Sequence, residues 1–552
     1  MKRLLFLTGG ACHDFKHASS FLSHLFQRSG WFEVEQTEDR DALKSLEQFD
    51  AAVFYTQGGK LSTEQERSLV RFVASGKGFL GVHCANDSFR ENTAYRAMIG
   101  SHFVAHAPET HLYPVAISNQ SHPLLVGIQE FQVVDEFYRC EFDAGLDVFL
   151  TGLWQGQTIP LAYTKSHDQG RVCYLAIGHD SRALENPTVS RLMVRGARWA
   201  AGCWPQTIRP LRWATVGYGG AFNMGHHHLK HASMAGLQPV AVCDADPARL
   251  EAAHKDYPRI RGYQKVEDLL RDSEVDGVTV IVPHHLHAPI GLRVVQAGKH
   301  LVMEKPFVTR VADADALIAA AKQSGSMLTV YHNRRWDGDF LRIEEIVGSG
   351  RIGEIFQIET FMGGFSRPGG KWWRDDKAVS GGLMLDWGAH FFFWINRLMP
   401  HPILSVEGFL HKRRWHHITN EDHGVILVRY EGGKSASFEL SSLAAIPKSP
   451  WRILGSRGGI ERTVNVPGAA EERFLRVISF GDDLVRREEK IPFASGWDDP
   501  RFNSFYSNVV SHLSAGEPLE ITAEEARKVI AIIEAGEKAS KEGKPQPLPK
   551  IF

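Results

Sequence analysis

Two stretches of the chain, in which short apolar runs alternate with segments of helical periodicity, limit the possible fold more than any other feature. In residues 1–205 the apolar runs are RLLFLTG, AAVFYTQ and GFLGVHC, separated by SSFLSHLFQRSG and TEQERSLVRFVASGKG. Such alternation is typical of βαβ units and a parallel sheet. Ser62 and Thr63, followed by Glu66, predict a capping box at the second helix. We therefore expect an α/β domain over residues 1–205.

A second alternation begins at Leu211, after a segment (203–210) whose two prolines indicate a linker. From about Ile355 strand patterns follow one another with little helix, which predicts a mostly antiparallel α+β domain. Near the end, Thr522 and Glu525 predict the N-cap and N3 residues of a long helix. We expect domains at 1–205, 210–331 and 332–552.

Composition excludes several classes of function. The formal net charge of -1 gives no sign of nucleic-acid binding. No apolar run approaches the ~20 residues that a membrane-spanning helix needs. The six cysteines form no C-x-x-C pair, so a reduced, cytoplasmic setting is expected. The chain has the composition of a globular enzyme without nucleic-acid or membrane partners.

The turn after Trp213, with the sequence WATVGYGGAFNMGHHHLKH, contains a modified dinucleotide-binding pattern. Gly217 and Gly219 follow a strand, but Phe222 occupies the third glycine position and Gly225 comes three residues later. Asp244 ends the next strand, where an acidic residue binds ribose hydroxyls and repels a 2′-phosphate. The glycines alone fit either a nucleotide loop or an ordinary βα turn. With Asp244 they favour NAD, with Gly217, Gly219, Gly220, Ala221 and Phe222 around the phosphates; no metal is expected at the histidines.

Polar residues also end the later strands of this domain. VPHHLHAPI places Pro283, His284 and His287 at one strand end, and KHLVMEKP places Glu304 and Lys305 at the next. Because ligands of open α/β sheets bind at strand carboxyl ends, these five residues are expected to bind the cofactor. In SGGLMLDWGAH, Asp386 and His390 lie four residues apart, on one helix face. A carboxylate and an imidazole in one pocket suit the removal of a hydroxyl proton during hydride transfer.

These patterns, in this order, resemble the Gfo/Idh/MocA oxidoreductase family. The resemblance covers about residues 211–548 and is most specific in EKP (304–306), in GG-x-x-x-D-x-G-x-H (381–390) and in the closing FYSNVVSHLSAGEPLEITAEEARKVIAIIEAG. It implies a Rossmann domain, an open-faced sheet domain, and hydride transfer between a nicotinamide and a sugar, cyclitol or glycoside. Lys305 would be the catalytic or substrate-orienting lysine, Asp386 would hold substrate and His390 would be the acid/base. This sequence departs from the family at Phe222, and also at His284 and Phe393.

Two further segments are candidates for substrate contact. YHNRRWDGDF (331–340) offers Arg335 and Trp336, and WWRDD (372–376) offers Trp373 and Arg374. Each could frame a sugar face and its hydroxyls, or could serve packing and salt bridging alone. Because exposed apolar sheet faces in such folds commonly pair, a homo-oligomer (dimer or tetramer) is expected.

The first domain carries dispersed polar residues after its strands. His13, His83, Glu136 and His179 stand in GGxxHD, GVH, DE-x-Y and a final GH. Cys84 is one residue away from a nucleophile position, so a Cys–His amidotransferase is not expected. The set resembles ThuA-like domains, a branch of the class I glutamine-amidotransferase-like fold, which implies a flavodoxin-like sheet and a link to sugar utilisation. These residues could bind a sugar, act as acid/base groups on a keto-sugar or hold a metal, and the domain could also be purely structural. Because the spacing is dispersed, no metal is predicted.

Together these features predict an NAD-dependent oxidoreductase that removes hydride from a ring hydroxyl of a sugar or glycoside, at C3, joined to a ThuA-like domain that binds or processes the keto-sugar. Two alternatives stay open. One is an NAD-dependent glycoside hydrolase that uses transient C3 oxidation and elimination. The other is a non-catalytic sensor or scaffold that binds NAD and sugar.

Overall fold

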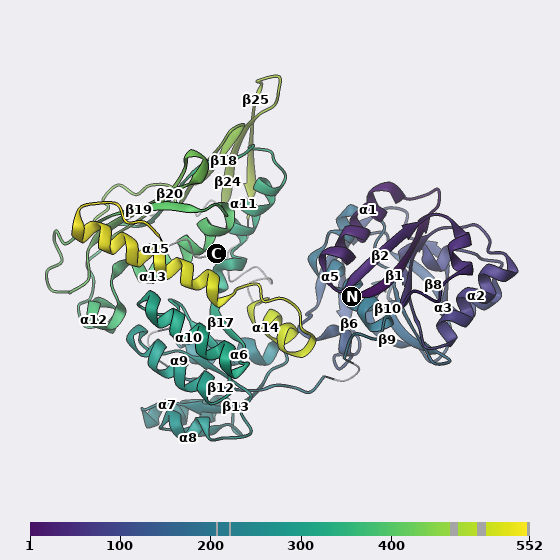
Figure 1. The fold of residues 1–552 in the computed structure, drawn as a ribbon, viewed down its shortest axis with the longest axis horizontal. Coiled ribbons are helices and arrows are strands. Elements are labelled where there is room, and N and C mark those ends of the chain that lie inside the picture. Colours follow the sequence, from purple (N-terminus) through teal and green to yellow (C-terminus); the bar gives the residue numbers. More distant parts are fainter. Residues whose placement is uncertain (206–207, 220–221, 464–472, 494–503, 549–552) are drawn as a thin grey trace. The chain divides into compact units, whose positions relative to one another are not determined.

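The computed structural model describes residues 1–205, 208–219, 222–463, 473–493 and 504–548. The chain divides into two compact units, one formed by Met1–Arg209 with Ser514–Gly516 and the other by Pro210–Leu513 with Glu517–Phe552. Figure 1 shows both units as ribbons. Among the described residues, no helix is both long and apolar enough to cross a membrane.

The first unit is built on a nine-stranded sheet with the order β2-β1-β3-β4-β11-β10-β9-β6-β7. The strands of its parallel half are β1 (Lys2–Gly9), β2 (Phe32–Thr37), β3 (Ala51–Thr56), β4 (Gly78–Val82) and β11 (Gly170–Leu175). Every residue of β3 and β4 is buried, as expected for strands covered on both faces. The helices are α1 (Phe15–Arg28), α2 (Thr63–Ala74), α3 (Thr93–Ile99), α4 (Ser181–Leu184) and α5 (Pro187–Ala200). Figure 1 shows α1 and α5 on one side of the sheet and α2 and α3 on the other, a flavodoxin-like arrangement.

The helix–strand alternation expected throughout this unit stops after α3. The next strands are β5 (Ser101–His106), β6 (His111–Ile117), β7 (Phe131–Asp135), β8 (Tyr138–Phe142), β9 (Asp147–Trp154) and β10 (Gln157–His167). β10, β9, β6 and β7 extend the sheet in antiparallel fashion, and β5 pairs with β8. Gln155 and Gly156, with φ of 47° and 81°, form the tight turn between β9 and β10.

The two predicted helix caps have different outcomes. Thr522 and Glu525 form a reciprocal capping box, as predicted. At α2 the box joins Ser62 to Gln65, so the prediction that used Glu66 was wrong. Glu66 lies one position past N3, and its carboxylate accepts hydrogen bonds from Tyr95 and Asn92 instead.

The second unit begins with a six-stranded parallel sheet of order β14-β13-β12-β15-β16-β17. Its strands are β12 (Arg212–Val216), β13 (Gln238–Cys243), β14 (Arg261–Tyr263), β15 (Gly277–Val280), β16 (His300–Glu304) and β17 (Leu328–Tyr331). Its helices are α6 (Met224–Met234), α7 (Pro247–Asp256), α8 (Val266–Leu270), α9 (His287–Gln296) and α10 (Val311–Ser324). The strand order reverses between β12 and β15, which is where dinucleotides bind in Rossmann folds.

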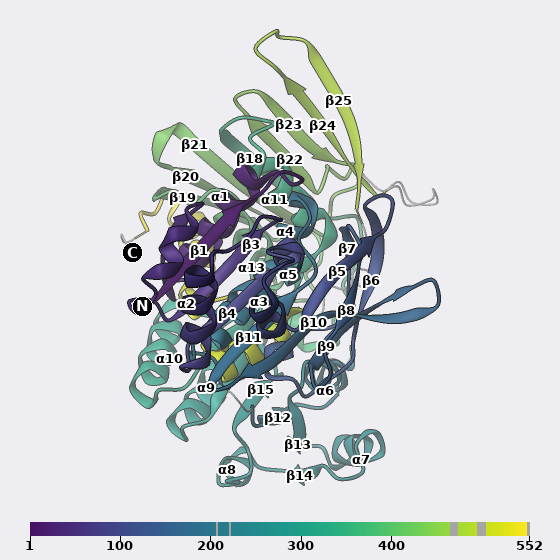
Figure 2. The ribbon, with the colours of Figure 1, turned by 90° about the vertical axis from the view of Figure 1, so that its right-hand side faces the viewer.

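An eight-stranded sheet of order β19-β20-β21-β18-β22-β23-β24-β25 completes the second unit. Its strands are β18 (Ile355–Gly363), β19 (Ile403–His411), β20 (His423–Tyr430), β21 (Lys434–Ser441), β22 (Trp451–Gly455), β23 (Gly458–Arg462), β24 (Phe474–Phe480) and β25 (Arg486–Pro492). Only β18 and β21 pair in parallel, among the described residues, so the predicted mostly antiparallel sheet is confirmed. Figure 2 shows β22 to β25 side by side at one end of this sheet.

The region that contains the eight-stranded sheet also contains helices. They are α11 (Gly338–Gly348), α12 (Lys377–Ser380), α13 (Leu383–Leu398), α14 (Ser504–Ala515) and α15 (Ala523–Glu542). α13 contacts β18, β20 and β21, and α15 contacts β19 and β20. Along β20 buried and partly exposed residues alternate, as expected for a strand with one covered face. This is the open-faced sheet that the sequence predicted.

Candidate active sites

The glycine turn after β12 has the close backbone packing of a phosphate-binding turn. Gly217 has a φ of 96°, and a Cβ there would lie 1.9 Å from the carbonyl oxygen of Ile281. Gly225, in the first turn of α6, packs so tightly that a Cβ would lie 2.7 Å from the Gly217 oxygen and from the Tyr218 Cα. The delayed glycine therefore supplies the close helix–strand contact that the third glycine of a G-x-G-x-x-G turn supplies. Gly220 and Ala221 lie outside the described residues.

A Gly225→Ala substitution is expected to weaken dinucleotide binding at least about tenfold and to destabilise the chain by about 1–3 kcal/mol. The added methyl would meet backbone atoms of the turn, which cannot move without displacing the start of α6. Fluorescence titration with reduced dinucleotide and thermal unfolding would measure both effects. Gly348→Ala is the matched control, because a Cβ at this α11 residue meets nothing within 4 Å. Equal binding by both variants would contradict the packing role of Gly225.

Asp244 lies against the glycine turn. One carboxylate oxygen accepts a hydrogen bond from the Tyr218 amide (2.8 Å), and the other accepts from the Asp246 amide (2.9 Å). The Arg249 side chain also lies on the turn, since a Cβ at Gly219 would be 2.5 Å from its Cδ. The glycines and the Asp244 carboxylate at the strand switch point thus fit a dinucleotide. The acidic Asp244 and the basic Arg249 both lie near the position that the ribose takes in such folds.

Phe222 connects the end of this turn to the substrate loop that the sequence predicted. Its side chain is 58% exposed. Its ring centroid lies 5.6 Å from that of Trp372 and 5.8 Å from the Arg374 guanidinium carbon. The residue at the missing glycine position therefore reaches the loop that also carries Trp373.

The predicted strand-end histidines hold turns together. His284, after Pro283, contacts the Ser380 carbonyl oxygen through Nδ1 (2.7 Å), and its ring lies 4.8 Å from that of Trp373. His287 is fully buried between the carbonyl oxygens of Pro306 (2.8 Å) and Val282 (3.0 Å). Both imidazoles thus connect separate segments around the β15 and β16 ends, and His284 also borders the loop of Trp373.

Glu304, at the end of β16, is held from two sides. One carboxylate oxygen lies 3.2 Å from His228 Nε2, and the other accepts a hydrogen bond from the Lys305 amide (2.6 Å). His228 Nδ1 in turn lies 2.7 Å from the Tyr506 hydroxyl. This buried network fixes the backbone from which the Lys305 side chain projects.

Lys305 and the start of α13 form a charged cluster. The Lys305 Nζ donates hydrogen bonds to the Asp386 carboxylate (2.9 Å) and to the Asp386 carbonyl oxygen (2.9 Å). Arg374 donates to the same carboxylate. His390, one helical turn after Asp386, is 4% exposed, and its Nδ1 has no hydrogen-bond partner among the described residues. The structure thus brings together Lys305, Arg374 and Asp386 from separate segments, with His390 beside them.

The charges in this cluster determine its protonation states. Burial alone would raise the Asp386 pKa, but Lys305 and Arg374 hold it well below its usual range, so the carboxylate is ionised. Burial lowers the His390 pKa well below its usual range, and the cations Lys305 and Arg334 lower it further. The site therefore presents a neutral imidazole beside an ammonium and a carboxylate. These groups can accept a hydroxyl proton and hold the substrate oxygen.

The predicted substrate residues at 335 and 336 lie elsewhere in this unit. Arg335 donates to the Glu344 carboxylate (2.6 Å), and the buried Trp336 lies 6.3 Å from the Phe505 ring. Their neighbour Arg334 instead lies over the Trp387 ring at 4.9 Å, next to the Asp386 helix. Since these three residues lie in one short helical turn, their side chains point in different directions.

Sequence reasoning missed His332 at the end of β17. Its ring stacks on that of Phe393 at 4.5 Å and lies 6.0 Å from the His390 ring. Burial, with Lys305 second, lowers its pKa to about 3. The sequence resemblance expects an acidic residue at position 393. The Phe393 ring stands there instead and gives the His332 imidazole an apolar stacking partner. The strand-end position of His332 was the available signal.

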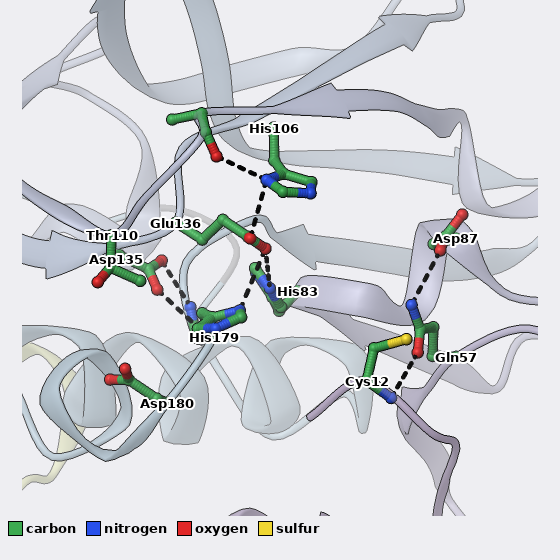
Figure 3. A network of polar contacts seen from close by, with 12 residues as sticks. Cys12, Gln57, His83, Asp87, His106, Thr110, Asp135, Glu136, His179 and Asp180 are labelled. Carbon is green, nitrogen blue, oxygen red and sulfur yellow. Dashed lines mark hydrogen bonds and ion pairs between the residues drawn. The ribbon is translucent and has the colours of Figure 1, made fainter. Parts of the chain in front are cut away.

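The first unit has a second cluster at the carboxyl ends of its parallel strands. His13 follows β1, His83 follows β4 and His179 follows β11. Glu136, next to β7, has its carboxylate 3.1 Å from His179 Nδ1 and 3.7 Å from His83 Nε2. Figure 3 shows the Glu136 carboxylate between His179, His83 and His106. All four predicted residues of this site are therefore together.

Neighbouring groups orient this cluster. The buried Asp135 carboxylate accepts hydrogen bonds from the Gly178 and His179 amides, both at 2.9 Å. His106 Nδ1 lies 2.9 Å from Glu136 and was not among the predicted site residues. The hydrogen bond to Glu136 raises the His179 pKa; burial lowers the His13 pKa to about 3. Burial alone would raise the Glu136 pKa, but His179 and His83 together lower it by more, so the net pKa lies below its usual range and this carboxylate is ionised.

The fold combines an α/β domain with a domain that has the strand order of a dinucleotide-binding Rossmann fold. Residues 3–200 match the ThuA family, described as trehalose utilisation. Residues 211–332 match the Gfo/Idh/MocA oxidoreductase family with its NAD-binding Rossmann fold, and residues 340–461 match the C-terminal domain of that family. The chain is a ThuA domain fused to an oxidoreductase of the Gfo/Idh/MocA family.

Similar proteins support this assignment. The scyllo-inositol 2-dehydrogenase (NADP(+)) IolW of Bacillus subtilis is 26% identical over 59% of this chain and 93% of that protein. Inositol 2-dehydrogenase of Salmonella typhimurium is 30% identical, over 24% of this chain and 41% of that protein. The structure of an NAD-binding protein from Listeria innocua is 27% identical with a TM-score of 0.53, covering 61% of this chain and 97% of that one.

Proposed function

We propose that residues 210–552 oxidise a ring hydroxyl of a sugar, glycoside or cyclitol with NAD as the hydride acceptor. The observation that carries this proposal is the convergence of Lys305, Asp386 and His390 beside a glycine turn suited to a dinucleotide. Inositol dehydrogenases among the relatives support a polyhydroxylated ring as substrate. A dinucleotide with its pyrophosphate at the glycine turn would supply the nicotinamide as hydride acceptor.

Each residue of the cluster has a distinct part in this proposal. His390 is neutral and takes the hydroxyl proton as the carbonyl forms. Lys305 donates a hydrogen bond to the same oxygen, and Asp386 orients both the ammonium and a neighbouring substrate hydroxyl. Arg374 and Trp373 line the loop beside this carboxylate and can pack on the sugar face.

NAD is the cofactor that we propose, rather than NADP. A 2′-phosphate on the adenosine ribose would face the Asp244 carboxylate, which the Tyr218 amide holds in place. Arg249 on the same turn offers some opposite charge, and the relative IolW is named for NADP(+). Titration with NADH and NADPH in parallel would test the preference, and tighter NADPH binding would contradict it.

We further propose that the ThuA domain binds or processes the keto-sugar. An ionised Glu136 beside His83 and His179 offers acid and base groups for a carbonyl substrate. We propose domains at 1–205, 210–331 and 332–552, so this site belongs to a different domain from the oxidoreductase site. We also expect the chain to form a homo-oligomer.

The test is turnover on a panel of sugars, glycosides and cyclitols with NAD, following reduced nicotinamide and carbonyl product together. Stoichiometric formation of both supports the dehydrogenase, and the product identifies the ring position, which we place at C3 for a hexoside. Glycoside cleavage at catalytic NAD without net reduction would instead show a redox-assisted hydrolase. Tight NAD binding without turnover of any compound would indicate a sensor.

The pH dependence of kcat/KM is expected to place the acid limb below pH 6.5, the ordinary histidine pKa. The limb reports loss of neutral His390, and a lowered pKa keeps this imidazole neutral to lower pH. Arg374→Gln removes a nearby cation, so the His390 pKa rises and the limb moves to higher pH. Arg271→Gln, an exposed arginine paired with Asp268, is the control and should leave the limb unchanged. A wild-type limb above pH 6.5 would contradict these roles.

A further inference from the structure

The three histidines of the first unit present their ring nitrogens to one small space. One ligand nitrogen from each of His13, His83 and His179 can be chosen so that all three lie within 4.8 Å of one another. The His13–His179 and His13–His83 ring centroids are 4.9 Å and 5.1 Å apart. Both nitrogens of His13 and the Nε2 of His83 are buried without a hydrogen-bond partner among the described residues. Unsatisfied buried polar atoms are costly unless a ligand engages them.

The orientation of His83 is fixed from behind. Its Nδ1 lies 2.7 Å from the Ala176 carbonyl oxygen, so Nδ1 carries the proton and the Nε2 lone pair faces the cluster. Metal-binding histidines commonly donate their other ring nitrogen to a carbonyl or carboxylate in this way. His83 also has a φ of 44°, a strained conformation that a surrounding structure retains at functional sites.

We propose that His13, His83 and His179 bind one first-row divalent metal ion, with zinc the best-fitting member. Three imidazoles suit Zn²⁺ and leave a fourth position open for an oxygen ligand. In tetrahedral zinc sites the ligand nitrogens lie about 3.4 Å apart. His13 and His179, both partly exposed, can close the remaining gap by rotating their side chains.

Glu136 supplies the charge that three neutral imidazoles lack. Its carboxylate lies beside both His179 and His83 and is held on its other side by His106. At 3.1 Å from His179 Nδ1 and 3.7 Å from His83 Nε2, the Glu136 carboxylate can accept the proton of a metal-bound water. It can also orient a hydroxyl oxygen at the open position of the metal. The ligand class implied for that position is a carbonyl or hydroxyl oxygen of a polyhydroxylated compound.

This inference departs from the sequence prediction, which expected no metal because the residues are dispersed. The parallel sheet removes that objection, since β1, β4 and β11 end at the same edge. It is also independent of the hydride-transfer proposal, which uses residues of the other unit only.

The test uses the full chain, freed of metal by dialysis against a chelator and titrated with ZnCl₂ in a calorimeter. We expect one zinc per chain with a Kd below about 1 µM. Cobalt(II) should occupy the same site and give visible absorption bands of a tetrahedral ion. His13→Ala, His83→Ala and His179→Ala should each weaken zinc binding more than about 100-fold, beyond the range for residues that only support ligands.

Two controls keep the test decisive. His24→Ala removes an exposed imidazole from α1 of the same unit and should bind zinc like the wild type. Because His83 is fully buried and its truncation can unfold the domain, the partly exposed His13 gives the deciding variant. Zinc should raise the Tm of the wild type and not that of His13→Ala, since a ligand stabilises only the state that binds it. Absence of one-to-one binding, or unchanged binding by His13→Ala and His179→Ala, would overturn the proposal.

Discussion

Replacing Lys305 with alanine is expected to lower kcat on the sugar substrate by about 10²–10⁴-fold. The Lys305 ammonium is the donor that we place on the reacting oxygen, and it also holds the Asp386 carboxylate with a 2.9 Å hydrogen bond. Its loss leaves Arg374 as the one ion-pair partner of Asp386 among the described residues, and leaves the developing alkoxide without the Lys305 ammonium. Steady-state measurement of kcat and KM, with NADH binding measured separately, would show the effect.

Matched variants separate chemistry from folding in this prediction. Lys322→Ala removes an exposed lysine of α10, which pairs with Glu524, and should change kcat less than about twofold. NADH binding should change much less than kcat in Lys305→Ala, because the glycine turn that we assign to the phosphates is formed by other residues. Full activity of Lys305→Ala would contradict the mechanism.

His390→Asn is the second substitution with a large expected effect, again about 10²–10⁴-fold on kcat. The asparagine side chain is polar but cannot take up the hydroxyl proton at neutral pH. Since His390 is 4% exposed, solvent does not easily replace its function. The remaining activity should also lose the acid limb of its pH profile, which a purely structural role would leave in place.

An exposed histidine of the same unit provides the control for this variant. His416→Asn alters an imidazole on the surface and should leave both kcat and the pH profile unchanged. A His390→Asn enzyme with an unaltered acid limb would assign the proton transfer to a different group.

The parts of the fold that the sequence predicted are those governed by local periodicity and by turns. The Gly217 turn, its extension to Gly225 and the helix carrying Asp386 and His390 follow from short-range patterns that the structure reproduces. The antiparallel strands between α3 and β11 were missed because their pairing depends on contacts across the sheet. Parallel strands with intervening helices are easier to predict, because the alternation of strand and helix periodicity is visible along the sequence itself.

In the candidate sites, too, local positions could be predicted from the sequence, whereas contacts between distant segments could not. The strand-end positions of His13, His83 and His179 could be read from sequence, but their meeting at one edge needed the strand order. Arg335 and Trp336 were chosen for residue type, and only the structure shows that the adjacent Arg334 faces the α13 cluster instead. Residue type alone does not show which of the neighbouring side chains of Arg334, Arg335 and Trp336 points toward the α13 cluster.

The measurement that tests the central claim most directly follows a deuterium label from substrate to cofactor. A sugar or cyclitol that the panel identifies, deuterated at the carbon to be oxidised, is incubated with the chain and NAD, and the nicotinamide product is analysed by mass spectrometry. Direct hydride transfer predicts one deuterium in the reduced nicotinamide and a carbonyl at the labelled carbon. Reduced nicotinamide without deuterium, or an intact label in the substrate throughout turnover, would contradict the account.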